Sequence, residues 1–441
     1  MNRELHKSPV TGRVRVLFLL LAVGLVVFAS VFAVACGGEE ATTTTAGVTT
    51  TAGPTTTAGA TTTTAPAVEL PATIKVGAVI PLTGANAGLG SQVKGGYELA
   101  VAQINDAGGV DIGGTKVPID LQILDDESDP TKTVQQLENL NSAGVVAYLG
   151  GAGSNLHAAA APIAEKNKIP YLGIGFAVMS PHQQGFKYLF SPFQKSNDQA
   201  RTAFEVIDTL DPLPTNVAIL KETTDWGKEL DTFWTEEATK RGMTVKTYEY
   251  APGTKDFSSI ILPAKNSGAD VLLALPTPPD GLALMKQVKE LDWNPSVILM
   301  IRAPDPPTFG GNLGADSDGV LFMPGWNPGV NFPGSAEMVQ AYKDKFDAPA
   351  VALTGPAYAC VQILADAISR AGVVEKDAIR DAIAATDMDT VIGPVTFEAD
   401  GTGNVVDIVN QWQGGKQALV WPLDQPAAAK TIYPLVPWKD R

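Results

Sequence analysis

From residue 73 onward, strand-like apolar runs alternate along the chain with segments of helical periodicity. The run IKVGAVI at 74–80 has the pattern of a buried strand, and Val93, Tyr97 and Val101 then recur at helical spacing. Further runs of the same kind, each followed by a helical segment, are PIDLQILDD, VVAYLGG, IPYLGIG, NVAILKE, TVKTYEY, DVLLALP and SVILMIRA. This alternation predicts an α/β fold with parallel sheets flanked by helices, wound as two Rossmann-like halves.

The last third of the chain changes character. Three helical segments lie between 335 and 386, and two β-rich stretches follow, DTVIGPVTFEADG and IVNQWQGGKQALVWP. We expect this part to complete both halves. Two comparable α/β lobes predict a ligand cleft between them, where the carboxyl ends of strands and the amino ends of helices converge.

The first 35 residues have the pattern of an export signal. Basic residues precede an apolar run over 16–35, and Ala33-Val34-Ala35-Cys36 ends it, followed by Gly37 and Gly38. This junction resembles the lipobox of bacterial lipoproteins, although Ala33 stands where Leu is usual, and it predicts lipidation of Cys36. An uncleaved transmembrane anchor formed by the apolar run over 16–35 is the alternative. Either reading places the rest of the chain outside the cytoplasm, tethered to a membrane.

A threonine-rich segment follows the leader. Of the 25 residues 41–65, 14 are Thr, and TTTAG recurs at 43–47, 49–53 and 55–59. Because such a composition cannot build a core, it predicts a disordered stalk over 36–72, either bare or O-glycosylated.

Composition and charge exclude several classes of protein. The formal net charge of -15 excludes binding to a phosphate backbone, so we expect no nucleic-acid partner. Two cysteines and three histidines are too few for zinc, iron–sulfur or disulfide frameworks. The acidic cluster at 125–129 lacks the spacing of a calcium loop. No nucleophile elbow, P-loop, dinucleotide fingerprint or HExxH motif is present, so we expect neither an enzyme nor a cofactor or metal.

The order of IKVGAVIPLTG, GGYELAVAQINDAGG, LQILDDESDP, the turn at 150–157, KDFS and DTVIGPVTFEADG resembles that of the branched-chain-amino-acid-binding family. These are the type I substrate-binding proteins of ABC importers, and the resemblance covers about residues 73–422. It implies a type I periplasmic binding protein fold in which ligand closes two lobes and the closed, monomeric form docks on a membrane permease. A lipoprotein that presents its ligand to a membrane sensor is the alternative.

The resemblance also implies lobe boundaries. Three crossover strands form the hinge, and we place them near 190–192, 322–325 and 393–395. The expected lobes are 73–192 with 326–393, and 193–325 with 394–437.

The turn after VVAYLGG is the first candidate site. Gly153 and Ser154 directly precede a helix, whose amino end favours an anion such as a carboxylate. In the family a serine at this turn and the backbone of the next loop hold the ligand's α-carboxylate, which implies Ser154, Gly175 and Ala177 here. The alternative is that Ser154 or Asn155 only caps the helix.

The remaining candidates form the cleft wall and the amine site. The resemblance implies an aromatic contact at Trp226, whereas Leu89 and Thr277 replace tyrosines. Where amino-acid-binding members place an acidic residue for the ammonium, this chain has Arg302, which suits a carboxylate and suggests an amine-free acid. The alternative is that Arg302 forms an ion pair at the surface or between the lobes, and that Asp305 receives the ammonium. The predicted ligand-binding residues are Leu89, Gly153, Ser154, Asn155, Gly175, Ala177, Trp226, Thr277 and Arg302.

Overall fold

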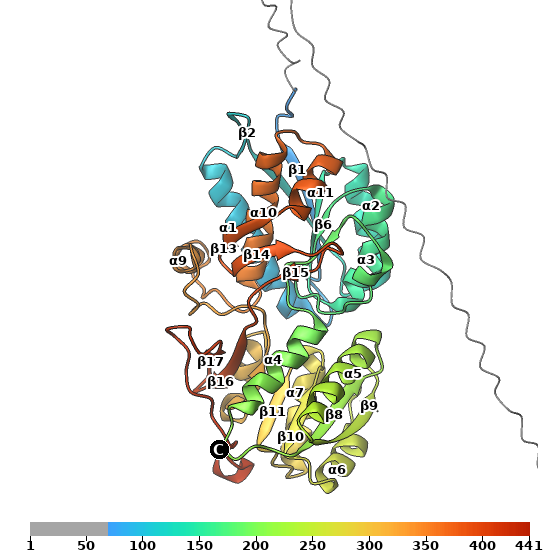
Figure 1. Ribbon diagram of the computed structural model, residues 1–441, viewed down its shortest axis with the longest axis vertical. Helices are drawn as coiled ribbons and strands as arrows, with labels where there is room; N and C mark the ends of the chain where they lie inside the picture. Colours follow the sequence, from blue (N-terminus) through green and yellow to red (C-terminus); the bar gives the residue numbers. More distant parts are fainter. Residues whose placement is uncertain (1–68) are drawn as a thin grey trace, which may run out of the picture. The chain divides into compact units, whose positions relative to one another are not determined.

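The computed structural model describes residues 69–441 (Figure 1). The export signal, the lipidation of Cys36 and nearly all of the stalk lie outside the described residues and stay predictions. Within the described part of the chain, no single helix is long and apolar enough to cross a membrane.

The first lobe is built on a five-stranded sheet in the order β4-β1-β5-β6-β7, and all its pairings are parallel. β1 pairs with β4 over its whole length, from Ile74 opposite Ile119 to Ile80 opposite Asp125, and with β5 on its other side. The strands are β1 (Ile74–Ile80), β4 (Ile119–Asp125), β5 (Ala147–Gly150), β6 (Tyr171–Leu172) and β7 (Leu189–Phe190), with a hairpin of β2 (Val110–Ile112) and β3 (Thr115–Val117).

Helices cover both faces of this sheet, and three helices of the lobe come from the last third of the chain. α1 and α10 pack together on one side, and α2 and α3 on the other (Figure 1). The helices of this lobe are α1 (Ala87–Asp106), α2 (Pro130–Ser142), α3 (Ser154–Asn167), α9 (Ser335–Phe346), α10 (Thr354–Ala371) and α11 (Lys376–Ala384), with a short 3-10 turn η1 (His182–Gln184). Cys360 is fully buried in α10.

The second lobe is built on a seven-stranded sheet in the order β17-β16-β12-β11-β10-β8-β9. Its five earlier strands are parallel, and β16 and β17 add an antiparallel edge. The strands are β8 (Asn216–Glu222), β9 (Thr244–Tyr250), β10 (Val271–Ala274), β11 (Val297–Met300), β12 (Leu321–Phe322), β16 (Val409–Gln413) and β17 (Lys416–Trp421). The helices are α4 (Ser196–Asp208), α5 (Asp225–Lys240), α6 (Ser258–Asn266), α7 (Pro278–Glu290) and α8 (Thr308–Leu313), with 3-10 turns η2 (Gly314–Ser317) and η3 (Trp438–Asp440).

Three connections join the two sheets: 191–195, 323–334 and 405–408. The third lies later than expected, because β13 (Asp387–Thr390), β14 (Gly393–Phe397) and β15 (Gly403–Asn404) form their own antiparallel sheet. This sheet stays beside β7, since Ser191 bridges Thr402 and its N–H donates to the carbonyl of Gly401 at 2.9 Å. The crossover expected at 393–395 is therefore wrong, and residues 394–404 lie with the first lobe.

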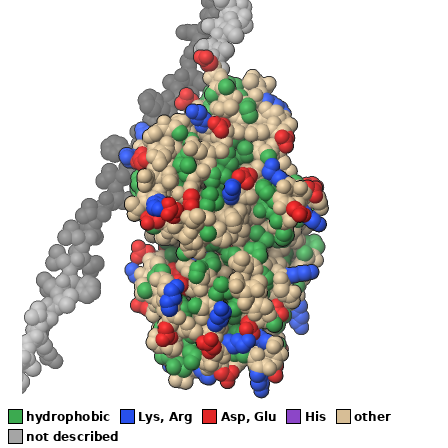
Figure 2. Space-filling model, turned by 180° about the vertical axis from the view of Figure 1, so that it is seen from behind, with side chains coloured by type: hydrophobic (Ala, Val, Ile, Leu, Met, Phe, Trp, Pro, Cys, Tyr) green, Lys and Arg blue, Asp and Glu red, His purple; other side chains and the backbone are tan. Residues whose placement is uncertain are grey.

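Charged side chains of both signs are spread over the surface of both lobes, with hydrophobic side chains between them (Figure 2). The strand ends that face the opposite lobe are where the candidate residues gather.

Candidate ligand-binding site

Two adjoining cavities lie between the lobes, an inner one of about 30 Å³ and an outer one of about 420 Å³. All nine predicted ligand-binding residues line them: Leu89, Gly153, Gly175 and Ala177 the inner cavity, Asn155 and Thr277 the outer, and Ser154, Trp226 and Arg302 both. The structure thus brings together residues that are up to 213 positions apart, from Leu89 to Arg302. Their roles in ligand binding stay predictions.

Ser154 occupies the first position of α3 and is 4% exposed. Gly153 precedes it with a φ of 131°, a backbone conformation that glycine adopts readily and other residues rarely do. No side chain forms a capping hydrogen bond at the amino end of this helix. The expected alternative, a serine or asparagine that only caps α3, is therefore wrong. Instead the Ser154 hydroxyl accepts the N–H of Val178 at 3.4 Å. The N–H groups of Leu156 and His157 donate to the carbonyl of Gly153. Those of Ser154 and Asn155, the first two of the helix, remain available to an anion.

A loop over residues 173–180, which we call the pocket loop, forms the part of the wall that lies next to the amino end of α3. Gly175 has φ of 61°, and its carbonyl accepts the N–H of Gly153 at 3.1 Å. A Cβ at Gly175 would lie 2.9 Å from that of Ala152, so the close approach of loop and helix requires glycine. The two segments predicted to hold a carboxylate are thus bonded to each other.

Helices of the second lobe also point their amino ends at the cavities. Thr224 caps α5 by accepting the N–H of Gly227 at 3.1 Å, and Thr277 caps α7 by accepting that of Asp280 at 3.4 Å. Trp226, two residues after the α5 cap, is 7% exposed, and its indole nitrogen has no hydrogen-bond partner among residues 69–441. Three helix amino ends therefore add positive potential to the cleft.

Arg302 is held by its own lobe. Its Nε donates to the carbonyl of Pro276 at 3.2 Å, and its Nη2 donates to that of Leu275 at 2.8 Å and to the carboxylate of Glu222. The guanidinium also lies 5.2 Å from the centre of the Trp226 ring. Because Nε and Nη2 already donate hydrogen bonds within the protein, they are not free to bind a ligand carboxylate in bidentate fashion. The geometry therefore favours the interpretation of Arg302 as an ion-pair residue. The pair is buried within the second lobe, not at the surface or between lobes as that alternative placed it.

Asp305 lines the inner cavity and is 5% exposed. Its Oδ1 has no hydrogen-bond partner in the described part of the chain. Burial raises the pKa of this carboxyl to about 8, against the lowering effect of Arg302. A buried acceptor without a partner costs free energy unless a ligand or a water bonds to it. Asp305 is therefore placed to contact a polar group of the ligand.

Sequence reasoning missed other residues of the cavities. Phe193, Gln199 and Leu353 line the inner cavity, and Asn86 lines the outer. Gln199 is 1% exposed and its Oε1 has no partner among residues 69–441. Their positions depend on how α4 and α10 pack, which no local pattern revealed.

His157 lines neither cavity. It is fully buried, with its Nδ1 2.7 Å from the hydroxyl of Tyr171 and its Nε2 near the carbonyls of Gly151 and Ile174. Burial lowers its pKa to about 3. It is a neutral core residue.

The family model described as periplasmic binding protein matches residues 73–416. Leu/Ile/Val-binding protein homolog 8 of Brucella abortus (strain 2308) is 28% identical over 381 residues, which cover 81% of this chain and 93% of that protein.

Solved structures share the fold. A branched-chain amino acid transporter substrate-binding protein of Streptococcus pneumoniae, in complex with isoleucine, has a TM-score of 0.72 at 22% identity, covering 78% of this chain and 97% of that one. A solute-binding protein of R. palustris, in complex with benzoate, has a TM-score of 0.69 at 20% identity, covering 82% and 99%. The type I periplasmic binding protein fold and the resemblance to branched-chain-amino-acid-binding proteins are confirmed. Since the family model matches well over half of its length, the chain belongs to the periplasmic binding protein family.

Proposed function

We propose that this chain is the extracytoplasmic substrate-binding lipoprotein of an ABC importer. It captures a small carboxylate-bearing ligand, a branched-chain or other amino acid, between its lobes and delivers it to a membrane permease. No chemistry is performed on the ligand. Binding shifts the population toward the closed form by as much as the ligand's affinity for that form exceeds its affinity for the open one.

One observation carries the carboxylate part of the proposal. Ser154, at the amino end of α3, lines the same inner cavity as Gly175 and Ala177 of the pocket loop. Helix N–H groups and a hydroxyl that converge on one small space suit an anionic group of a ligand. The name of the Brucella relative, a Leu/Ile/Val-binding protein homolog, supports the same class.

Asp305 supports an amine on the ligand. An ammonium would give its unpartnered Oδ1 a charged donor, and the inner cavity of about 30 Å³ has room for a group of that size. The alternative is an amine-free carboxylate, such as the benzoate bound by the R. palustris protein. It is favoured by the raised pKa of about 8, because a protonated Asp305 would itself donate a hydrogen bond to a carboxylate.

Calorimetric titration of the full-length chain in detergent tests the ligand class. Leucine, isoleucine and valine are compared with 4-methylpentanoate, which is leucine without its amine, and with benzoate. Binding of the amino acids alone supports the proposal, and binding of the amine-free acids alone supports the alternative. Absence of binding by every probe contradicts both.

The membrane anchor is tested separately. Cys36→Ser should release the chain from the membrane fraction of a secreting host, because the acceptor of the lipid is lost. If the variant stays in that fraction, an uncleaved transmembrane leader is the better explanation.

A further inference from the structure

The side chain of Gln194 joins all three connections between the lobes. It lies in the first connection and is 1% exposed. Its amide donates to the carbonyl of Met323, in the second connection, at 3.2 Å, and accepts the N–H of Ile408, in the third, at 3.4 Å. Because both bonds are shielded from water, they link the three connections to one another, so that a movement of one connection acts on the other two.

The next two residues bind the same segment to the pocket loop. Lys195 Nζ donates to the carbonyl of Phe176 at 2.7 Å. The N–H and the hydroxyl of Ser196 both donate to the carbonyl of Ala177, at 2.9 and 3.0 Å. Since Ala177 lines the inner cavity, the hinge is hydrogen-bonded directly to the cavity wall.

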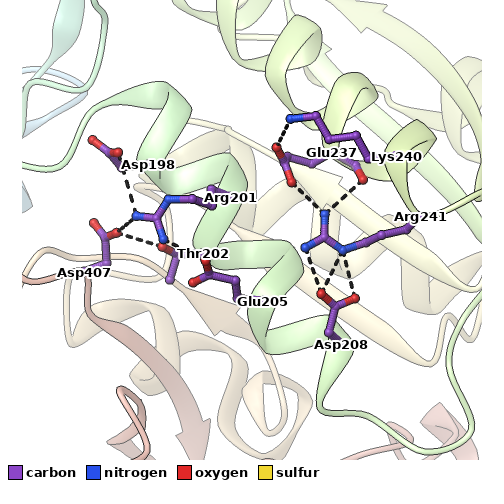
Figure 3. A network of polar contacts seen from close by, with 9 residues as sticks. All are labelled: Asp198, Arg201, Thr202, Glu205, Asp208, Glu237, Lys240, Arg241 and Asp407. Atoms are coloured by element: carbon purple, nitrogen blue, oxygen red, sulfur yellow. Dashed lines mark hydrogen bonds and ion pairs between the residues drawn. The ribbon is translucent and has the colours of Figure 1, made fainter.

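The middle of α4 is also tied to the third connection. Arg201 forms an ion pair with Asp407, and the Thr202 hydroxyl donates to the same carboxylate at 2.8 Å (Figure 3). A change in the angle between the lobes that moves the third connection must therefore also move α4 and the residues that begin it.

Lys195 is a lysine whose burial opposes stability, because its charged form is removed from water. It is 2% exposed, and burial lowers its pKa well below the usual range although Asp198, Asp400 and Glu229 raise it from a distance. Its ammonium lies 4.1 Å from the centre of the Phe176 ring. An apolar side chain in such a place is often as stable as the charge or more so. The fold therefore gains little from Lys195 except the position of the pocket loop.

We propose that Lys195 is a positioning residue which, with Gln194 and Ser196, couples the pocket loop to the hinge. Through this coupling the hinge angle sets the position of the Phe176 and Ala177 carbonyls. A ligand held by the pocket loop then favours the closed arrangement of the three connections. The inference rests on the proposed function, because it assigns the pocket loop to ligand binding.

The test compares Lys195→Met with wild type in the full-length chain. Calorimetric titration with leucine and 4-methylpentanoate gives Kd, thermal unfolding gives the midpoint, and small-angle X-ray scattering gives the change in radius of gyration on saturation. Loss of a hydrogen bond from a charged group should raise Kd roughly tenfold for the probe that binds wild type. The thermal midpoint should not fall, and the compaction on saturation should be smaller.

Two further variants separate coupling from damage to the fold. Ser196→Ala removes one hydroxyl and should also weaken binding. Lys240→Met, at a lysine that is 64% exposed on α5, should leave Kd unchanged. An unchanged Kd in both Lys195→Met and Ser196→Ala, with wild type binding normally, contradicts the coupling and leaves the proposed function standing. Absence of binding by wild type to every probe contradicts the proposed function, and the coupling with it.

Discussion

The guanidinium of Arg302 pairs with the carboxylate of Glu222 in the wall of the cleft, where the two residues are 9% and 1% exposed. Glu222 ends β8 and Arg302 follows β11, so the pair spans β10 in the sheet order. Arg302 has φ of 78°, a left-handed conformation that costs free energy outside glycine. Such strain persists where the surroundings hold it, here through the bonds to Glu222, Leu275 and Pro276.

Breaking this pair on one side should destabilise the chain strongly. Glu222→Ala leaves a buried guanidinium without its counter-charge, and we expect a loss of about 3–5 kcal/mol in the free energy of unfolding. Denaturant unfolding measures it. Glu138→Ala, in the exposed pair with Lys166, is the matched control and should cost about 0–1 kcal/mol. The double variant Glu222→Leu with Arg302→Leu should recover part of the loss. Equal losses in the free energy of unfolding for Glu222→Ala and Glu138→Ala would contradict the prediction that the buried pair matters more for stability than the exposed one.

Ser154→Ala should weaken ligand binding without unfolding the chain. In the proposed site this hydroxyl donates a hydrogen bond to the carboxylate of the ligand. About 1.5–3 kcal/mol is typical for such a bond, so Kd should rise by roughly one to two orders of magnitude. Titration calorimetry with leucine measures the change. Ser142→Ala on the exposed end of α2 is the control. An affinity equal to that of wild type removes Ser154 from the site.

Asp305 gives the ligand-free chain a pH dependence of definite sign. Burial raises its pKa to about 8 from the ordinary value of 3.8, so the folded chain holds this proton more tightly than the unfolded chain does. Its contribution to the free energy of unfolding is therefore greatest at low pH and declines as pH rises from about 4 to about 8. Thermal midpoints of wild type and Asp305→Asn, measured across this pH range, isolate the contribution of Asp305. The midpoint of wild type should fall relative to that of the variant as pH rises. A constant difference contradicts the raised pKa.

The buried histidines act in the opposite sense. Burial lowers the pKa values of His157 and His182 to about 3, below the ordinary value of 6.5. As pH falls, these histidines take up protons in the unfolded chain before they do so in the folded chain. Their contribution to the free energy of unfolding is therefore fully present above about pH 6.5 and is lost as pH drops toward 3. His182→Gln should make the free energy of unfolding less steep between pH 6.5 and 4, as measured by denaturant titration. If wild type and variant keep the same slope, His182 is not held neutral by the fold.

Much of the fold could be predicted because local sequence patterns indicate its strands and helices. Buried strands such as β1 are short apolar runs, and the Asp129-Pro130 start of α2 is a cap followed by proline, which the structure shows as a side-chain cap. The third connection was placed too early because the sequence of β14 has the pattern of a strand in either case, whether the strand crosses between the lobes or pairs with β13. Pairing partners are set by tertiary contacts that a single strand does not encode.

The candidate site was predicted where it lies in turns and missed where it depends on packing. Gly153 and Ser154 stand between a strand and a helix, and that order alone directs them to the cleft. Arg302 was placed at the cleft, but its partner Glu222 lies 80 residues away and could not be paired with it from the sequence. Gln199 reaches the inner cavity only because α4 is anchored by the first connection.

The parallel pairing of β1 with neighbours on both sides has a mechanical consequence. Any force that reaches the folded unit through the residues before Ile74 pulls along the axis of a strand bonded to β4 over its full length and to β5. Such a pull loads those bonds together, in shear, rather than opening them one after another from an edge. Because forced unfolding is governed by the unfolding barrier, the attachment of the chain at β1 should withstand tension better than attachment through an edge strand.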